Sequence, residues 1–221
     1  MTNKTLSKGA HDFIDDAAII DLTRDSKEDK GRVRDIIAKS MSKVPLSIEE
    51  VADLIAADSE ESTQELFNAA RELKQKVYGN RIVIFAPLYI GNKCINDCTY
   101  CAFRSSLEST VRKTLNKKEL EQQVLALEQA GHKRLILVFG EHPDYTPEYM
   151  AETVNQVYKV KEGNGEIRRV NINAAPMDHD GYKILKQAGI GTYQIFQKTY
   201  HHKTYNEVHP PRHARGIMNT V

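Results

Sequence analysis

From about residue 81 onward, short apolar runs alternate with amphipathic segments, and this alternation constrains the fold more than any other feature. The apolar runs are rich in β-branched residues, as buried strands are. They occupy residues 82–90, 134–140, 167–174 and 192–197. Helices are expected between them, at 116–131, from Thr146-Pro147, and at 178–188. Strands and helices that alternate at this spacing predict an α/β fold with a parallel sheet and right-handed crossovers.

The first 80 residues have a different pattern, which is typical of consecutive helices. Two capping boxes, Ser47-x-x-Glu50 and Ser62-x-x-Glu65, are expected to start helices, the second of which should end at Gly79. No catalytic group of residues stands out here, so we expect a helical extension with a packing role. An apolar stripe at helical spacing is formed by Val33, Ile36, Ile37 and Met41.

Composition narrows the classes of partner and compartment. The chain has 31 basic and 30 acidic side chains, so it lacks the charge excess typical of nucleic-acid or membrane-surface binding. Its N-terminus is polar with no signal-peptide core, and no apolar run reaches about 18 residues. We therefore expect a cytoplasmic protein with a small-molecule partner, no nucleic acid and no membrane association.

All three cysteines lie within C-I-N-D-C-T-Y-C, just after the first apolar run. Thiolates of Cys94, Cys98 and Cys101 can hold three irons of a [4Fe-4S] cluster and leave the fourth iron open to another ligand. A disulfide would leave one reactive thiol over, which makes an oxidised framework the weaker alternative. A zinc site would need a fourth ligand such as His142 or the His201-His202 pair. The iron-sulfur interpretation is favoured, so the motif indicates a chemical role for this loop beyond folding.

Polar residues follow each of the four expected strands. Parallel strands of a barrel end at one rim, where active sites gather, so we expect these groups to converge. In chain order they are the three cysteines, then Gly140-Glu141-His142-Pro143, then Asn171 and Asn173, and finally Gln197-Lys198-Thr199-Tyr200.

The cysteine motif resembles that of a known superfamily. C-x3-C-x-aromatic-C, with Tyr100 before the third cysteine, is the signature of the radical S-adenosylmethionine (radical SAM) enzymes, and Gly140-Glu141 looks like their methionine-binding motif. The chain is more specifically similar to the N-terminal part of the HydG family, the tyrosine lyases that mature [FeFe]-hydrogenase. This similarity extends over residues 12 to 209, and its main stretches are 76–94, 132–143, 163–176 and 188–197.

The resemblance implies a fold, two cofactors and a set of binding residues. The fold would be part of a (β/α) TIM-type radical SAM barrel behind an N-terminal helical extension. The cofactors would be a [4Fe-4S] cluster on the three cysteines and S-adenosyl-L-methionine on the open iron. Packing remains an alternative role for Phe103, and strand capping remains one for the two asparagines. The implied cofactor-binding residues are Tyr100 and Phe103 beside the adenine, Gly140 and Glu141 at the amino group, and Asn171 and Asn173 towards ribose and substrate.

The resemblance also implies a reaction. Reductive cleavage of S-adenosylmethionine gives a 5′-deoxyadenosyl radical, and in the family this radical cleaves tyrosine to p-cresol and dehydroglycine, the source of carbon monoxide and cyanide. Other hydrogenase maturation proteins would be partners. One alternative is the ThiH-like 2-iminoacetate synthase of thiamine biosynthesis, which shares tyrosine cleavage. Another, from a different class, is a non-catalytic iron-sulfur or metal-binding module.

Two departures from the family pattern affect these expectations. Lys198 stands where the family usually has Glu, which reverses the charge beside the expected cofactor pocket. The chain also ends at Val221, with residues 211–221 unmatched to the family. We therefore expect a helical extension over 1–80, an incomplete radical SAM core over 81–210, and an unmatched tail. A barrel that cannot close exposes strand edges, so a truncated chain with impaired activity is expected.

Overall fold

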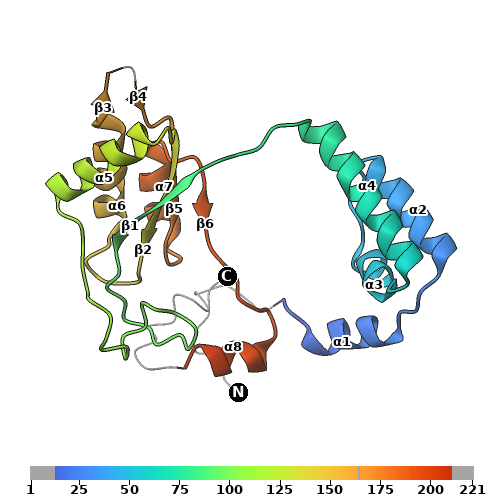
Figure 1. Ribbon diagram of the computed structural model, residues 1–221. Coiled ribbons are helices and arrows are strands. Elements are labelled where there is room, and N and C mark those ends of the chain that lie inside the picture. The colour runs from blue at the N-terminus through green and yellow to red at the C-terminus, as the bar shows by residue number, and fades with distance from the viewer. Residues whose placement is uncertain (1–12, 164, 211–221) are drawn as a thin grey trace. The chain divides into compact units, whose positions relative to one another are not determined.

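The computed structural model describes residues 13–163 and 165–210, which form two compact units (Figure 1). The helical unit comprises residues 13–83, and the sheet unit begins at residue 84. Each unit is described by itself. Among the described residues, no helix is both long and apolar enough to cross a membrane.

The helical unit contains four helices, each started by a side-chain cap. The cap residues Asp15, Asp29, Ser47 and Ser59 accept a hydrogen bond from a main-chain amide of the first turn. The predicted capping box of Ser47 and Glu50 is confirmed. Val33 and Ile36 of the expected apolar stripe are buried. The helices are α1 (Asp16–Asp25), α2 (Lys30–Met41), α3 (Ile48–Ala56) and α4 (Glu60–Tyr78).

The second predicted capping box is wrong, because α4 begins before Ser62. Ser59 caps the helix and accepts a hydrogen bond from the Ser62 amide at 3.3 Å. The Ser62 hydroxyl is buried and donates to Glu28 at 2.5 Å. Ser59, which directly precedes the acidic first turn of the helix, is the N-cap instead of Ser62. The helix ends at Gly79 as predicted, at a backbone φ of 59° that glycine adopts without strain.

The sheet unit is built on a four-stranded parallel sheet, which confirms the predicted α/β fold class. The strand order is β1-β2-β5-β6, so each next strand of the sheet is added on the same side. Tyr89, Val138, Asn173 and Gln194 are register partners across the four strands. The sheet is open in the described residues, as in part of a barrel. The strands are β1 (Ala86–Gly91), β2 (Arg134–Phe139), β5 (Arg169–Asn173) and β6 (Tyr193–Gln194).

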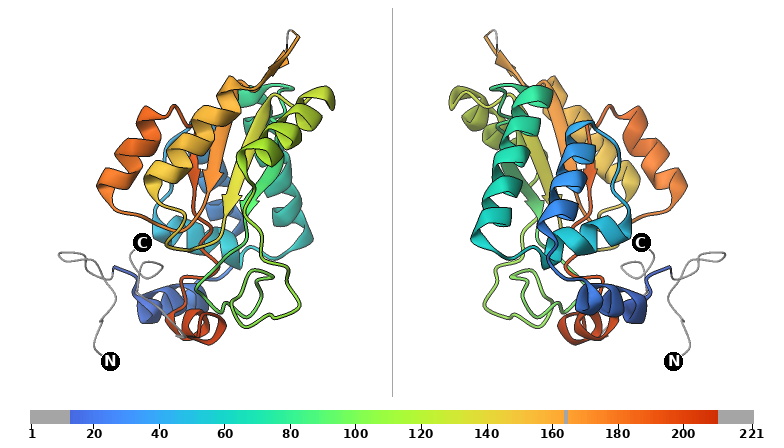
Figure 2. Two further views of the ribbon diagram at one scale, coloured as in Figure 1. Left: turned by 90° about the vertical axis from the view of Figure 1, so that its left-hand side faces the viewer. Right: turned by 90° about the vertical axis from the view of Figure 1, so that its right-hand side faces the viewer.

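Helices follow the strands as predicted. Asn116, Thr146 and Asp178 cap the three crossover helices. The left view of Figure 2 shows α5, α6 and α7 in front of the sheet, and they cover one of its faces. A short hairpin and the last helix were not predicted. The helices are α5 (Lys117–Gln129), α6 (Pro147–Lys159), α7 (His179–Gln187) and α8 (His202–Val208), and the hairpin pairs β3 (Lys161–Glu162) with β4 (Gly165–Glu166).

All four strands are shorter than their apolar runs, and β1 and β6 each lack four residues of the run. Pairing of β1 with β2 starts at Ala86 opposite Leu135, so residues 82–85 precede the ladder and are not strand. The last run, 192–197, keeps only the two residues of β6 that pair with β5. An apolar run in the sequence is thus longer than the part of it that pairs with a neighbouring strand. The expected tail, 211–221, lies outside the described residues.

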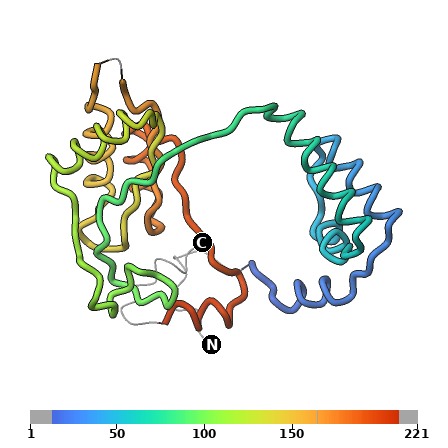
Figure 3. The backbone as a smooth tube through the Cα atoms, in the orientation of Figure 1, coloured from blue at the N-terminus to red at the C-terminus, as the bar shows by residue number. Residues whose placement is uncertain are grey.

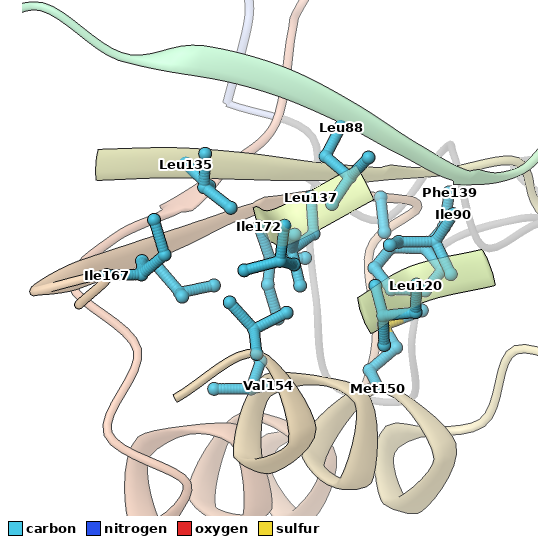
Figure 4. Packing of buried hydrophobic residues seen from close by; sticks show 14 of the residues in the cluster. Leu88, Ile90, Leu120, Leu135, Leu137, Phe139, Met150, Val154, Ile167 and Ile172 are labelled. Atoms are coloured by element: carbon cyan, nitrogen blue, oxygen red, sulfur yellow. The ribbon is translucent and has the colours of Figure 1, made fainter. Parts of the chain in front are cut away.

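The core lies between the sheet and the crossover helices (Figure 4). Leu135 and Leu137 of β2 and Ile172 of β5 pack there with Val154 and Met150 of α6. The residues of β5 alternate, so Val170 and Ile172 are buried while residues 169, 171 and 173 lie on the opposite face. One face of β5 therefore packs in the core, and its other face carries polar side chains.

Candidate functional site

The three cysteines lie on a long loop between β1 and α5, which we call the cysteine loop (residues 92–113). Figure 3 follows this loop from the end of β1 past α8. Cys98 is buried, and Cys94 and Cys101 are half-buried. Tight turns shape the middle of the loop, where the Cys101 amide donates to the Cys98 carbonyl at 3.0 Å. The thiols are therefore presented by an ordered backbone without helix or strand.

One arginine holds the cysteine loop together. The Arg112 guanidinium donates to the carbonyl oxygens of Phe103 at 2.8 Å and Arg104 at 2.6 Å, and also reaches those of Asn92 and Leu107. A guanidinium has five donors in a fixed fork, so it can join both ends of a loop. The sequence analysis missed this residue, because no motif marks an arginine whose partners are main-chain carbonyls.

The ends of β1 and β2 meet at the cysteine loop. Gly140 donates from its amide to the Gly91 carbonyl at 3.0 Å, and Ile95 donates to the Glu141 carbonyl at 2.8 Å. A Cβ on Gly140 would lie 2.1 Å from the Lys93 carbonyl oxygen, so only glycine fits this approach. The side-chain amide of Asn96 donates to the Glu141 carboxylate at 2.5 Å. The structure thus brings Gly140 and Glu141 to the cysteines, as the sequence predicted.

Burial sets the protonation of these groups in the cluster-free protein. It raises the pKa of the Cys94 and Cys98 thiols, and the neighbouring thiols raise the pKa of Cys98 further. Burial also raises the pKa of the Glu141 carboxyl, against the opposing effect of the Asn96 hydrogen bond. Iron that binds here must displace thiol protons, since thiolate is the form that coordinates metal.

The donor set consists of the three thiols and a main-chain amide that donates to one of them. The Phe103 amide donates to the Cys101 sulfur at 3.3 Å, a contact of the kind that tunes iron-sulfur clusters. Within the described ranges, no three His, Cys, Asp or Glu side chains gather as a single-ion site. His142 instead contacts Asp144, and His201 contacts Thr204 at 2.8 Å. In a [4Fe-4S] cluster each thiolate binds its own iron, so three thiols of one loop need not converge on one point.

Aromatic side chains flank the cysteines. Phe103 meets Tyr89 of β1 edge to face, with ring centroids 6.0 Å apart. Tyr100 contacts His209, which follows α8, and its hydroxyl lies 2.6 Å from the His209 Nε2 atom. Tyr100 and Phe103 are therefore beside the cysteines, and their expected place along the adenine stays a prediction.

The two asparagines share the face of β5 that points away from the crossover helices. Asn173 donates to the Gln194 carbonyl of β6 at 2.9 Å, so its amide joins two strands at the rim. Asn171 accepts a hydrogen bond from Arg169 at 3.3 Å. The strand-capping alternative thus describes the contact that Asn173 makes, while both residues remain on the polar face.

Lys198 lies next to the cysteine loop. Its ammonium nitrogen is 5.2 Å from the ring centroid of Tyr100 and 5.2 Å from that of Phe196. A lysine over an aromatic face makes a cation-π contact, which a glutamate at this position could not make. Of the polar group after β6, Lys198 therefore contacts the cysteine loop, beside Cys101.

Comparison with known proteins gives a family. The family model described as Radical SAM superfamily matches residues 88–220. A crystal structure of HydG, a maturase of the [FeFe]-hydrogenase, is 42% identical with a TM-score of 0.87, over 92% of this chain and 46% of that chain. The HydG maturase structure from Carboxydothermus hydrogenoformans is 40% identical with a TM-score of 0.74, over 87% of this chain and 44% of that one.

A curated relative gives a more distant match. The 2-iminoacetate synthase of Escherichia coli (strain K12) is 27% identical over 184 residues, which is 81% of this chain and 46% of the relative. The chain thus spans about half the length of the relatives it matches. Members of the matched superfamily bind a [4Fe-4S] cluster and S-adenosylmethionine. The chain belongs to the radical SAM superfamily and is similar to the N-terminal part of HydG.

Proposed function

We propose that Cys94, Cys98 and Cys101 bind a [4Fe-4S] cluster, whose open iron takes S-adenosyl-L-methionine. The observation that carries this proposal is the direct hydrogen bonding of the cysteine loop to Glu141 at the end of the neighbouring strand. When bound, these cofactors would supply radical chemistry by reductive cleavage of the sulfonium, and the protein would bind, orient and shield them.

The side chains at the rim have distinct roles in this proposal. Glu141 accepts a hydrogen bond from the amino group of S-adenosylmethionine, and Asn96 orients its carboxylate. Gly140 allows the close approach of the strand end to the loop. Tyr100 and Phe103 lie along the adenine, while Asn171 and Asn173 face ribose and substrate from β5.

The reaction we propose is radical cleavage of the Cα–Cβ bond of tyrosine. The 42% identity to the hydrogenase maturase supports it, and hydrogenase maturation proteins would then be partners. The second candidate is the 2-iminoacetate synthase reaction, which the E. coli relative favours. Both candidates require the same cluster, so cluster chemistry is tested first. Two further proposals concern the rest of the chain and its compartment. Residues 1–80 form an extension with a packing role. The compartment is the cytoplasm, where thiols stay reduced.

Anaerobic reconstitution with iron and sulfide tests the site. We expect one [4Fe-4S] cluster per chain and an electron paramagnetic resonance signal that shifts when S-adenosylmethionine is added. Cys98→Ala should abolish the cluster, because this chain has no spare cysteine. A cluster that is absent, or indifferent to S-adenosylmethionine, would contradict both candidates and leave a non-catalytic metal-binding module.

Glu141→Gln separates cofactor binding from cluster binding. It should keep the cluster and weaken the affinity for S-adenosylmethionine about tenfold or more, because a charged hydrogen-bond acceptor is lost. Glu108→Gln, on an exposed part of the cysteine loop, is the matched control. Release of p-cresol from tyrosine by the reduced, reconstituted protein then tests the reaction, and a radical signal without p-cresol would contradict tyrosine as substrate.

A further inference from the structure

Tyr100 is held from several sides by the segment that follows β6. This segment, residues 196–209, includes Phe196, Lys198, α8 and His209, and we call it the anchor segment. The Thr99 amide, next to Tyr100, donates to the Val208 carbonyl of the anchor segment at 3.0 Å. The middle of the cysteine loop is therefore tied to a part of the chain that is about a hundred residues away in sequence.

The Tyr100 hydroxyl, which also interacts with the Cys98 thiol, has a partner in the anchor segment. The His209 Nδ1 atom lies 2.9 Å from the Tyr205 carbonyl, which can only accept, so Nδ1 carries the hydrogen. In this tautomer Nε2 is the acceptor for the Tyr100 hydroxyl, which lies 2.6 Å away. His209 is also stacked on Tyr205, with ring centroids 4.1 Å apart. The acceptor is thus fixed in place.

The Tyr100 ring has a second, independent contact. The Lys198 ammonium nitrogen is 5.2 Å from the Tyr100 centroid and 5.2 Å from the Phe196 centroid. The Lys198 ammonium thereby joins a ring of the cysteine loop to a ring of the anchor segment. The contact needs the positive charge of Lys198 and the ring of Tyr100, but it does not need the Tyr100 hydroxyl.

We propose that Lys198 and His209 are positioning residues, which fix Tyr100 and the cysteine loop against the anchor segment before any cluster is bound. Neither residue needs to touch iron or substrate for this role. The proposal goes beyond cofactor binding by the cysteines, because it concerns the metal-free protein. It also gives the charge reversal at Lys198 a physical reason, because the positive charge is stabilised by the two aromatic rings beside it.

Hydrogen exchange of the Thr99 amide in the metal-free full chain tests the proposal. Lys198→Met keeps the apolar stem and should speed exchange about two- to fivefold, the size of an exposed cation-π contact. Lys198→Arg should restore protection, since it keeps the cation. His209→Phe keeps the stacked ring but loses the acceptor, and should speed exchange about two- to tenfold. Lys203→Met, on the exposed side of α8, is the matched control and should change nothing.

Tyr100→Phe distinguishes the two contacts. In that background the His209→Phe effect should shrink, because the hydroxyl is already gone and only the Nδ1 contact to the Tyr205 carbonyl is lost, while the Lys198→Met effect should persist. Amides of β2 provide an internal reference for global unfolding. The proposal is overturned if Lys198→Arg exchanges as fast as Lys198→Met, if His209→Phe acts undiminished in the Tyr100→Phe background, or if neither variant differs from Lys203→Met. Because no metal is present, these outcomes are independent of the cluster experiment.

Discussion

The helical unit and the sheet unit are stabilised by different interactions. Residues 13–83 bury four apolar side chains and rely on helix caps and ion pairs, such as Arg34 with Glu61 and Glu65. The sheet unit buries a cluster of seventeen apolar side chains between its strands and helices. Within that unit the cysteine loop differs again, because polar contacts to the main chain define its shape. Stability and chemistry are thus placed in separate parts of the sheet unit, which can be perturbed separately.

The largest effect is expected from the apolar core. Leu137→Ala removes a fully buried side chain of β2, and should lower the free energy of unfolding of the sheet unit by about 2 to 5 kcal/mol. Denaturant unfolding followed by circular dichroism measures this change. Val111→Ala, at a side chain that is 82% exposed in the cysteine loop, should stay within about 0.5 kcal/mol. Equal effects of the two substitutions would contradict the division between core and loop.

The next effect concerns the cysteine loop. Arg112→Met removes a guanidinium that reaches four carbonyls, and should cost about 1 to 3 kcal/mol of local stability. Faster hydrogen exchange over residues 101–107 and a lower yield of reconstituted cluster should follow, while the β2 amides stay protected. Arg104→Met is the matched control, because its hydrogen bonds are long at 3.5 Å. Loss of protection in β2 as well would show that the loop and the core are one cooperative element.

The smallest expected effect compares a buried carboxylate in each unit. Glu128 of α5 has no hydrogen-bond partner for either carboxylate oxygen among the described residues, so Glu128→Met should raise the stability by about 1 kcal/mol. Glu50 of α3 is paired with Lys39 at 2.7 Å and completes the Ser47 capping box, so Glu50→Met should lower it. Chemical unfolding of both variants gives the two signs. Changes of the same sign would contradict this contrast.

Most of the fold was predictable because it depends on local patterns. The crossover helices have a cap and an apolar period, and the strands have buried runs, so their order and parallel pairing could be expected. Strand ends were less predictable, since the first apolar run starts at residue 82 but β1 begins at residue 86, where pairing with β2 starts. The β3–β4 hairpin joins strands of two residues each, which is too short to show a period.

The site was predictable where a motif exists. Cys94, Cys98 and Cys101 and the Gly140-Glu141 pair have characteristic spacing and positions at strand ends, and the structure brings them together. Arg112 and His209 were not predicted, because their partners lie on the main chain or far away in sequence. Such contacts follow from the folded path of the chain and leave no local pattern.

The hydrogen bonds of Arg112 to the cysteine loop affect which positions of the loop can be substituted. All of its partners are carbonyl oxygens, which every amino acid carries. The guanidinium therefore constrains the course of the backbone and leaves the exposed side chains of Glu108 and Ser109 open to substitution. Evolution or an engineer could change these two positions, for example to attach a reporter group or to meet a different electron donor, without moving the thiols.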